Sequence, residues 1–156
     1  MPRKARLILD NVCYHIVTRG NEKRVVFRDE SDFKEYIKLI LKYKDRYKSR
    51  LYGWCFMNNH VHMVIESENL IKFMHGINLS YAKYFRYKYK GAGHLWQDRY
   101  KSFVIQKDGY LINCISYIEY NPVRAKIALR PEDYQWSSYR ARIFGEKKKL
   151  LDAITL

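Results

Sequence analysis

Residues 51–66 read LYGWCFMNNHVHMVIE, and this stretch contains the pattern that decides the fold. Two short runs rich in aromatic and β-branched residues, 51–57 and 60–66, predict strands because such side chains fit a pleated, half-buried surface. Asn58 and Asn59 separate the two runs by two residues, which is typical of a tight hairpin turn. We therefore expect two neighbouring antiparallel strands in the middle of the chain.

The segments that flank this hairpin predict the rest of a small domain. Alternating side chains predict strands over 12–18 and 99–106, and apolar residues at helical spacing predict helices over 29–47, 70–89 and 109–121. Asp108 is a suitable cap for the last helix, which we expect to end at Asn121 because Pro122 disfavours helical backbone before it. The order of elements favours an α+β class and a ferredoxin-like antiparallel sheet with helices packed mainly on one face.

Composition and charge limit the classes of function. The 156 residues suit one domain, which we assign to 1–145, followed by a basic C-terminal tail at 146–156. Lysine and arginine number 30 against 16 acidic residues, and the net charge of +14 indicates a polyanionic partner. No apolar run is long enough to span a bilayer, and Asp10 interrupts the apolar residues 7–9, so we expect no secretion signal. Three widely spaced cysteines indicate reduced thiols and a cytoplasmic protein.

Two histidines in the second strand of the hairpin are candidate metal ligands. His60 and His62 are two residues apart, so a strand places both imidazoles on one face, while the residues between and after them point into the core. Two neutral nitrogen ligands at this spacing suit a single metal ion and leave positions for another ligand and for substrate oxygens. The alternative is a pair of surface histidines without a metal. No Cys-x-x-Cys pair accompanies them, which disfavours a structural zinc site.

The predicted helix at 109–121 adds two polar side chains to this hypothesis. Tyr117 and Asn121 are one turn apart and about 40° apart around a helix, whereas Tyr120 lies about 100° from Asn121. The amide oxygen of Asn121 can complete a His-His-amide metal site, and the phenol of Tyr117 can reach a metal-bound group. The alternative interpretation makes Tyr117 an aromatic residue at the edge of the core and Asn121 a C-terminal cap.

Five ordered blocks of the sequence resemble one family of enzymes. They are YHIVTRGN at 14–21, NNHVHMV at 58–64, LWQDRY at 95–100, YIEYNPVRA at 117–125 and WSSY at 136–139. In these blocks the chain is similar to the single-tyrosine His-hydrophobe-His transposases of the IS200-like family, and especially to the branch associated with repetitive extragenic palindromes. The blocks span most of the chain, and the resemblance implies the HUH endonuclease fold.

The resemblance implies a role for each residue of the candidate site. His60 and His62 bind Mg²⁺ or Mn²⁺, Tyr117 is the nucleophile, and Asn121 is the third metal ligand, at a position where some relatives have glutamine. Tyr120 is the second candidate for the nucleophile. The resemblance also implies metal-dependent cleavage and strand transfer of single-stranded DNA at hairpin-forming sites, through a 5′-phosphotyrosine intermediate. Insertion-sequence relatives form dimers that exchange the tyrosine helix, whereas the palindrome-associated branch can act as a monomer with a complete site. We therefore expect a monomer, with a homodimer as the alternative.

Residues that contact DNA or activate the nucleophile are the last candidates. Arg19, Trp96 and Arg99 are candidate DNA-binding residues, because each lies in one of the five blocks at a predicted loop or strand end. A structural role is the alternative for each. Glu66 shares the strand face of the histidines and is a candidate to activate the tyrosine, unless it is simply a solvated residue at a strand end.

Two other functions stay open at this point. The chain could be a non-catalytic nucleic-acid-binding protein of the same fold, or a metal-dependent phosphodiesterase that uses water. A DNA-directed enzyme of this kind is expected to associate with the nucleoid.

Overall fold

A four-stranded antiparallel sheet forms the centre of the molecule. The computed structural model describes residues 12–91, 93–107 and 109–154. The strands are β1 (Val12–Arg19), β2 (Arg50–Phe56), β3 (His60–Glu66) and β4 (Lys101–Gln106), and they lie in the order β2-β3-β1-β4. All neighbouring strands are antiparallel, and β2 and β3 form the hairpin that the central stretch predicts. The α+β class and the ferredoxin-like sheet are therefore confirmed. Asp108 and the apolar residues 7–9 lie outside the described residues.

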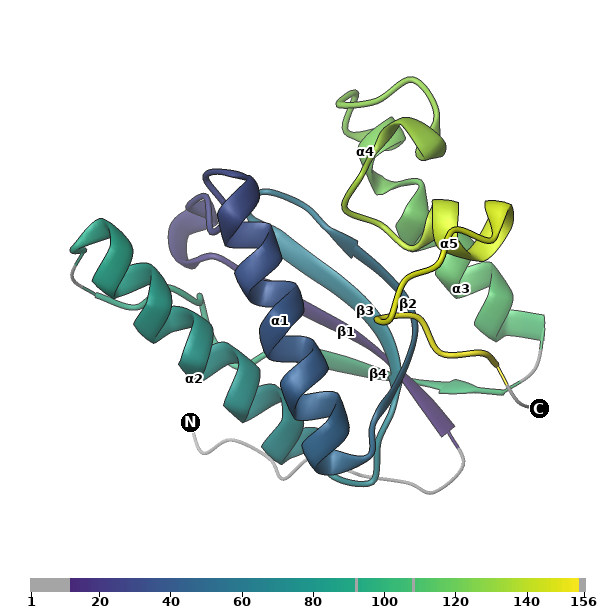
Figure 1. Cartoon of the computed structure of the whole chain (residues 1–156), viewed down its shortest axis with the longest axis horizontal. Helices are drawn as coiled ribbons and strands as arrows, with labels where there is room; N and C mark the ends of the chain where they lie inside the picture. Colours follow the sequence, from purple (N-terminus) through teal and green to yellow (C-terminus); the bar gives the residue numbers. More distant parts are fainter. Residues whose placement is uncertain (1–11, 92, 108, 155–156) are drawn as a thin grey trace.

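The helices cover the two faces of the sheet unequally. Helices α1 (Glu30–Tyr47) and α2 (Leu70–Tyr89) lie side by side on one face, and α3 (Gly109–Glu119) lies on the other (Figure 1). A large aromatic cluster fills the space beneath α1 and α2, and a much smaller apolar cluster lies beneath α3. The smaller cluster contains Cys13, Tyr52 and Val64 of the sheet and Ile115 of α3. Part of the α3 face is consequently left uncovered.

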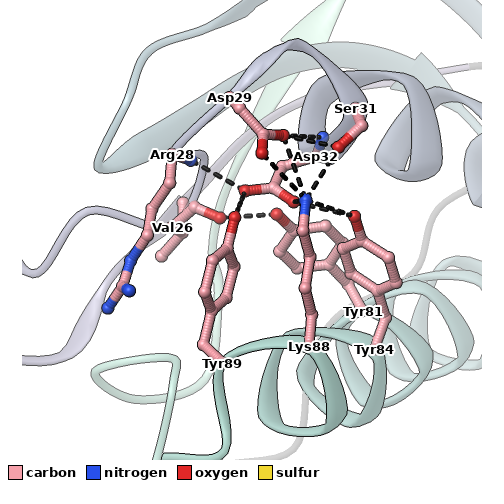
Figure 2. Close-up of polar contacts among 9 residues, drawn as sticks. All are labelled: Val26, Arg28, Asp29, Ser31, Asp32, Tyr81, Tyr84, Lys88 and Tyr89. Atoms are coloured by element: carbon pink, nitrogen blue, oxygen red, sulfur yellow. Dashed lines mark hydrogen bonds and ion pairs between the residues drawn. The ribbon is translucent and has the colours of Figure 1, made fainter.

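A polar network fastens the start of α1 to the end of α2 (Figure 2). The Lys88 ammonium lies 2.8 Å from the fully buried carboxylate of Asp32 and 3.0 Å from that of Asp29. The hydroxyls of Tyr84 and Tyr89 also donate hydrogen bonds to Asp32, at 2.7 and 2.5 Å. Buried charges are tolerated when they are paired and fully hydrogen-bonded. The network therefore holds the two long helices together at one end and keeps this carboxylate ionised inside the protein.

Helix α3 ends earlier than the sequence pattern predicts. The pattern extends it to Asn121, but the helix ends at Glu119, and Tyr120 caps a separate short helix, α4 (Asn121–Arg124). Pro122 has no N–H to donate to the preceding turn, so the chain cannot continue α3 and instead places the proline in the first turn of α4. Strand β4 also begins later than predicted, at Lys101 instead of Arg99.

A glycine in β2 allows α3 to lie close to the sheet. A Cβ atom built on Gly53 would be 2.6 Å from the Cγ2 atom of Ile115, which is closer than real side chains approach. The pairing of β2 with β3 also shifts between Leu51 and Gly53. The absence of a side chain at position 53 therefore sets the distance between α3 and the sheet.

The last described residues pack against the domain. Leu150 is buried in the large cluster, and its carbonyl oxygen accepts a hydrogen bond from Lys44. Asp152 forms an ion pair with Lys44 and exchanges hydrogen bonds with the backbone of Leu51. The remaining short elements are α5 (Tyr139–Phe144) and the 3-10 turns Asn21–Lys23 and Pro131–Asp133. Within the described residues, no helix is both long enough and apolar enough to cross a membrane.

Candidate active site

The two histidines of β3 lie on the face of the sheet that α3 partly covers. Val61, Met63 and Ile65 are fully buried in the cluster on the opposite face, as the alternation along the strand predicts. His62 is 8% exposed and His60 is half-buried, so the pair is less open to solvent than the sequence suggests. The centroids of the two rings are 5.0 Å apart, and the rings are nearly perpendicular.

Each of these imidazoles has one nitrogen engaged by a neighbouring side chain. Asn59 Oδ1 lies 2.6 Å from His60 Nδ1, and His15 Nε2 lies 3.0 Å from His62 Nδ1. An amide oxygen only accepts hydrogen bonds, so His60 carries its proton on Nδ1 and has a free lone pair on Nε2. The bond with His15 can give His62 the same tautomer. Hydrogen bonds of this kind orient histidines for metal binding.

Sequence analysis did not identify His15 as part of the site. The alternation over 12–18 places His15 and Arg19 on one face of β1, but only the pairing with β3 shows which face that is. Arg19 pairs with His60, and His15 lies diagonally across from His62. The sequence therefore lacked one piece of information, namely which face of β1 lies beside the histidines of β3.

Both histidines of the pair are neutral at physiological pH. Burial, together with the charge of Arg19, lowers the pKa of His60 to about 4. Burial lowers the pKa of His62 to about 3, and the nearby His60, His15, Arg19 and Arg124 contribute to the shift. A neutral imidazole is the form that binds a metal ion, so the two side chains are ready to act as ligands.

Tyr117 lies at the end of α3 and exposes its side chain. It is 60% exposed, whereas its neighbours Ile118 and Glu119 are fully buried, which excludes a role as a core aromatic residue. The Arg124 guanidinium lies 3.9 Å from the centroid of the Tyr117 ring and donates a 2.6 Å hydrogen bond to the Tyr117 carbonyl oxygen. The positive charge of Arg124 also contributes to lowering the pKa of His62.

Asn121 lies in α4, so the helical stripe predicted for Tyr117 and Asn121 is wrong. The break at Tyr120 removes the single helix on which the angle of about 40° depended. Asn121 nevertheless stays beside Tyr117, because Arg124 donates to Asn121 Oδ1 at 2.8 Å while it covers the tyrosine ring. The Nδ2 atom of Asn121 is buried and has no hydrogen-bond partner among the described residues. Tyr120 faces elsewhere, with its ring 6.2 Å from that of Tyr139 in α5.

Comparison with known proteins assigns the chain to a family. Residues 8–121 match the family described as "Transposase IS200 like", and this segment covers well over half of the chain. The chain belongs to the IS200-like transposases. None of the curated proteins matches it in sequence.

Two solved structures share the fold of this transposase. One is a REP-associated tyrosine transposase bound to a REP hairpin, with a TM-score of 0.75, 16% identity and complete coverage of both chains. The other is a transposase from Deinococcus radiodurans R1, described as putative, with a TM-score of 0.51 and 16% identity. That match covers 76% of this chain and 96% of the other. At these identities the likeness shows the fold.

The residues of the transposase site fit a divalent metal ion that accepts nitrogen and oxygen ligands. The described residues contain no group of three or more histidine, cysteine, aspartate or glutamate side chains suited to a metal. Beside His60 and His62, Asn121 Oδ1 is the candidate for a third protein ligand. An amide oxygen has two lone pairs, so it can bind a metal while Arg124 donates to it, or after Arg124 moves.

The three candidate DNA-binding residues of the transposase occupy two places. Arg19 is exposed and pairs with His60 across β1 and β3. Trp96 is half-buried, and its indole N–H donates to the carbonyl oxygen of Asn78 in α2. Trp96 and Arg99 line a groove between α2 and the loop at 94–100. Arg19 therefore lies beside the histidines, whereas the side chains of Trp96 and Arg99 line this groove, although the backbone of Trp96 pairs with Gly20 next to Arg19.

Glu66 does not join the candidate site. It lies four residues beyond His62, which is about 13 Å along a strand. Its carboxylate accepts a hydrogen bond from Tyr52 at 2.5 Å and pairs with Lys107 at 2.7 Å. Burial raises the pKa of Glu66, but the bonds from Lys107 and Tyr52 outweigh it and hold the pKa below its ordinary value. An ionised, doubly bonded glutamate at the far end of the strand is a structural residue.

Proposed function

We propose that this transposase cleaves and rejoins single-stranded DNA at hairpin-forming sites, with Tyr117 as the nucleophile. The observation that carries the proposal is an exposed tyrosine at the end of α3, on the same side of the sheet as a buried and a half-buried histidine that are both neutral. The solved relative that is bound to a REP hairpin supports hairpin DNA as the partner.

The chemistry uses the phenol oxygen of Tyr117 and conserves the energy of the phosphodiester bond. The Oη–P bond forms and the P–O3′ bond breaks, the phenol proton passes to solvent, and the departing oxygen takes a proton from solvent to become a 3′-hydroxyl. The DNA is then joined to Tyr117 through its 5′-phosphate. A second 3′-hydroxyl can reverse the step and join new strands, which is what transposition requires.

The surrounding side chains hold the reacting groups. His60 and His62, with Asn121 as third ligand, would hold Mg²⁺ or Mn²⁺, and the hydrogen bonds of their Nδ1 atoms with Asn59 and His15 keep their Nε2 atoms available. When bound, the ion supplies Lewis-acid polarisation of a non-bridging phosphate oxygen. Arg124 brings a permanent positive charge to the ring of Tyr117, where negative charge collects on the phosphate and the phenol oxygen.

We further propose a monomer as the active form, in keeping with the palindrome-associated branch that the sequence resembles. A nucleoid-associated, cytoplasmic enzyme is the location we propose for a protein that acts on chromosomal hairpins. Neither point is needed for the chemistry.

The test is a covalent adduct. The protein is incubated with hairpin-bearing single-stranded DNA and Mn²⁺, and products are separated under denaturing conditions. We expect a protein–DNA adduct that Tyr117→Phe abolishes and the matched control Tyr120→Phe retains. Cleavage without an adduct, unaffected by Tyr117→Phe, would instead identify a hydrolase that uses water. Binding without cleavage or adduct would identify a non-catalytic DNA-binding protein.

A further inference from the structure

A row of four aromatic rings crosses the sheet beside the proposed site. It runs from Phe103 in β4 to His15 in β1 and then to His62 and His60 in β3. The ring centroids are 5.9, 5.2 and 5.0 Å apart in that order. Phe103 is paired directly with His15 across the two strands, so both side chains stand on the same face of the sheet.

Phe103 is the exposed end of this row. Its side chain is 52% exposed, although it lies on the face that carries the smaller core. Ile105, two residues later on the same face, packs against the cluster beneath α3. The cover that α3 provides therefore ends between these two positions. A single exposed apolar residue is common on protein surfaces, so exposure alone does not indicate a function.

Positive charge on the same face distinguishes Phe103 from an ordinary exposed residue. Lys101 is exposed, and it precedes Phe103 by two residues in β4, so it shares the same face. Arg19 is exposed at the end of β1 and acts electrostatically on both His60 and His62. Proteins that bind single-stranded nucleic acid combine cations that follow the backbone with aromatic faces on which bases stack. This strip of the sheet has both features.

We propose that Phe103 is a stacking platform for an unpaired base of the DNA strand that enters the site, with Lys101 and Arg19 neutralising the adjoining phosphates. The proposal rests on the proposed function, because the strand must pass the histidines for its next base to meet Phe103. Every base has a flat aromatic face, so this contact positions the strand without reading its sequence. Sequence recognition is left to other parts of the protein.

Binding measurements on two matched DNA probes test the platform. One probe is a fluorescein-labelled hairpin with a single-stranded flank, and the other is the same hairpin without a flank. We expect Phe103→Ala to weaken binding of the flanked hairpin by between about 5-fold and about 150-fold, the range for loss of one stacked base. Binding of the flankless hairpin should not change, and Phe103→Trp should retain affinity for both probes.

Val104 provides the matched control in the same strand. It is 48% exposed and points to the opposite face of the sheet, where it pairs with Tyr14. Val104→Ala removes a comparable exposed apolar side chain and should leave both affinities at the wild-type value. Circular dichroism and thermal unfolding establish that each variant is folded.

The outcomes separate this inference from the proposed function. Wild-type affinity of Phe103→Ala for the flanked hairpin would overturn the platform, and so would an equal loss for both probes. The proposed function is judged independently by the covalent adduct of the wild-type protein. A flank-dependent loss in Phe103→Ala without any wild-type adduct would support the platform and overturn only the catalytic role.

Discussion

Removal of the ion pair that anchors α3 should lower the stability of the fold and leave the candidate nucleophile, Tyr117, less firmly positioned. Glu119, the last residue of α3, is fully buried and pairs with Arg142 of α5 through contacts of 2.5 and 3.1 Å. Ser138 donates a further 2.5 Å hydrogen bond to the same carboxylate, and the Trp54 backbone N–H of β2 donates to Ser138. This chain of contacts holds the end of α3, two residues after Tyr117, to α5 and the sheet.

The two members of the pair should have unequal effects on stability. Removing one partner of a buried ion pair costs about 3–5 kcal/mol, because the other charge is left without compensation. Arg142 is 16% exposed at its side chain, whereas Glu119 is inaccessible. We therefore expect Arg142→Leu, which strands the buried carboxylate, to cost near 5 kcal/mol on this scale, and Glu119→Leu to cost near 3 kcal/mol. The double variant should lose less than the sum of the two.

Urea unfolding of the wild type, both single variants and the double variant measures the coupling. A coupling energy above about 1 kcal/mol is expected for groups in direct contact. The single variants should also form the DNA adduct more slowly than the wild type, while hairpin binding stays close to normal. Additive losses, or an Arg142→Leu variant less affected than Glu119→Leu, would refute this account of the anchor.

Three further predictions concern the histidines and the packing of α3. His15→Phe keeps an aromatic ring beside His62 but removes the hydrogen bond to Nδ1, so Mn²⁺ affinity measured by calorimetry should fall about 10- to 100-fold, with exposed His75→Phe as an unaffected control. Equal affinity in both variants would contradict a positioning role for His15. The pKa of His62 is lowered from 6.5 to about 3, so below pH 6.5 the unfolded chain takes up a proton that the folded chain does not. Stability therefore falls with acidification. Proton uptake by this residue in the unfolded chain should lower the free energy of unfolding by about 2 kcal/mol at pH 5 relative to pH 7, as measured by urea unfolding with EDTA. The stability of His62→Gln should depend less on pH than that of the wild type. An unchanged dependence would show that the lowered pKa of His62 is not its cause. Gly53→Ala places a Cβ 2.6 Å from Ile115 and should destabilise the protein by about 1–3 kcal/mol, whereas a Cβ at Gly109 meets nothing within 4 Å. Equal melting temperatures for the two glycine variants would contradict the close approach of α3.

Long periodic patterns were sufficient to predict most of the fold. Helices α1 and α2 and the β2–β3 hairpin begin and end within about one residue of their predicted limits, because their apolar residues repeat over several turns or pleats. The end of α3 was predicted two residues too late. A proline after a helix can stop it or enter a new first turn, and the sequence pattern is the same in both cases.

The candidate site was only partly accessible to sequence reasoning. The period of two along β3 was enough to place His60 and His62 on one face, since that inference needs a single strand. His15 and Phe103 depend on the pairing of β1 with β3 and β4, which links residues that are 40 or more positions apart. Arg124 depends on the turn between α3 and α4, where a local change in backbone direction brings its guanidinium over Tyr117. These long-range pairings and local bends leave no periodic signal.

The unequal division of the core between the two faces of the sheet has a consequence for how such proteins diversify. The aromatic cluster under α1 and α2 contains most of the buried apolar residues, and Arg19, Lys101 and Phe103 are not among them. Substitutions at positions 19, 101 and 103 therefore spare the region on which folding chiefly depends. Changes in how tightly this side of the sheet holds a DNA strand can therefore arise with little risk of unfolding, and a combinatorial library at these positions should contain mostly folded members.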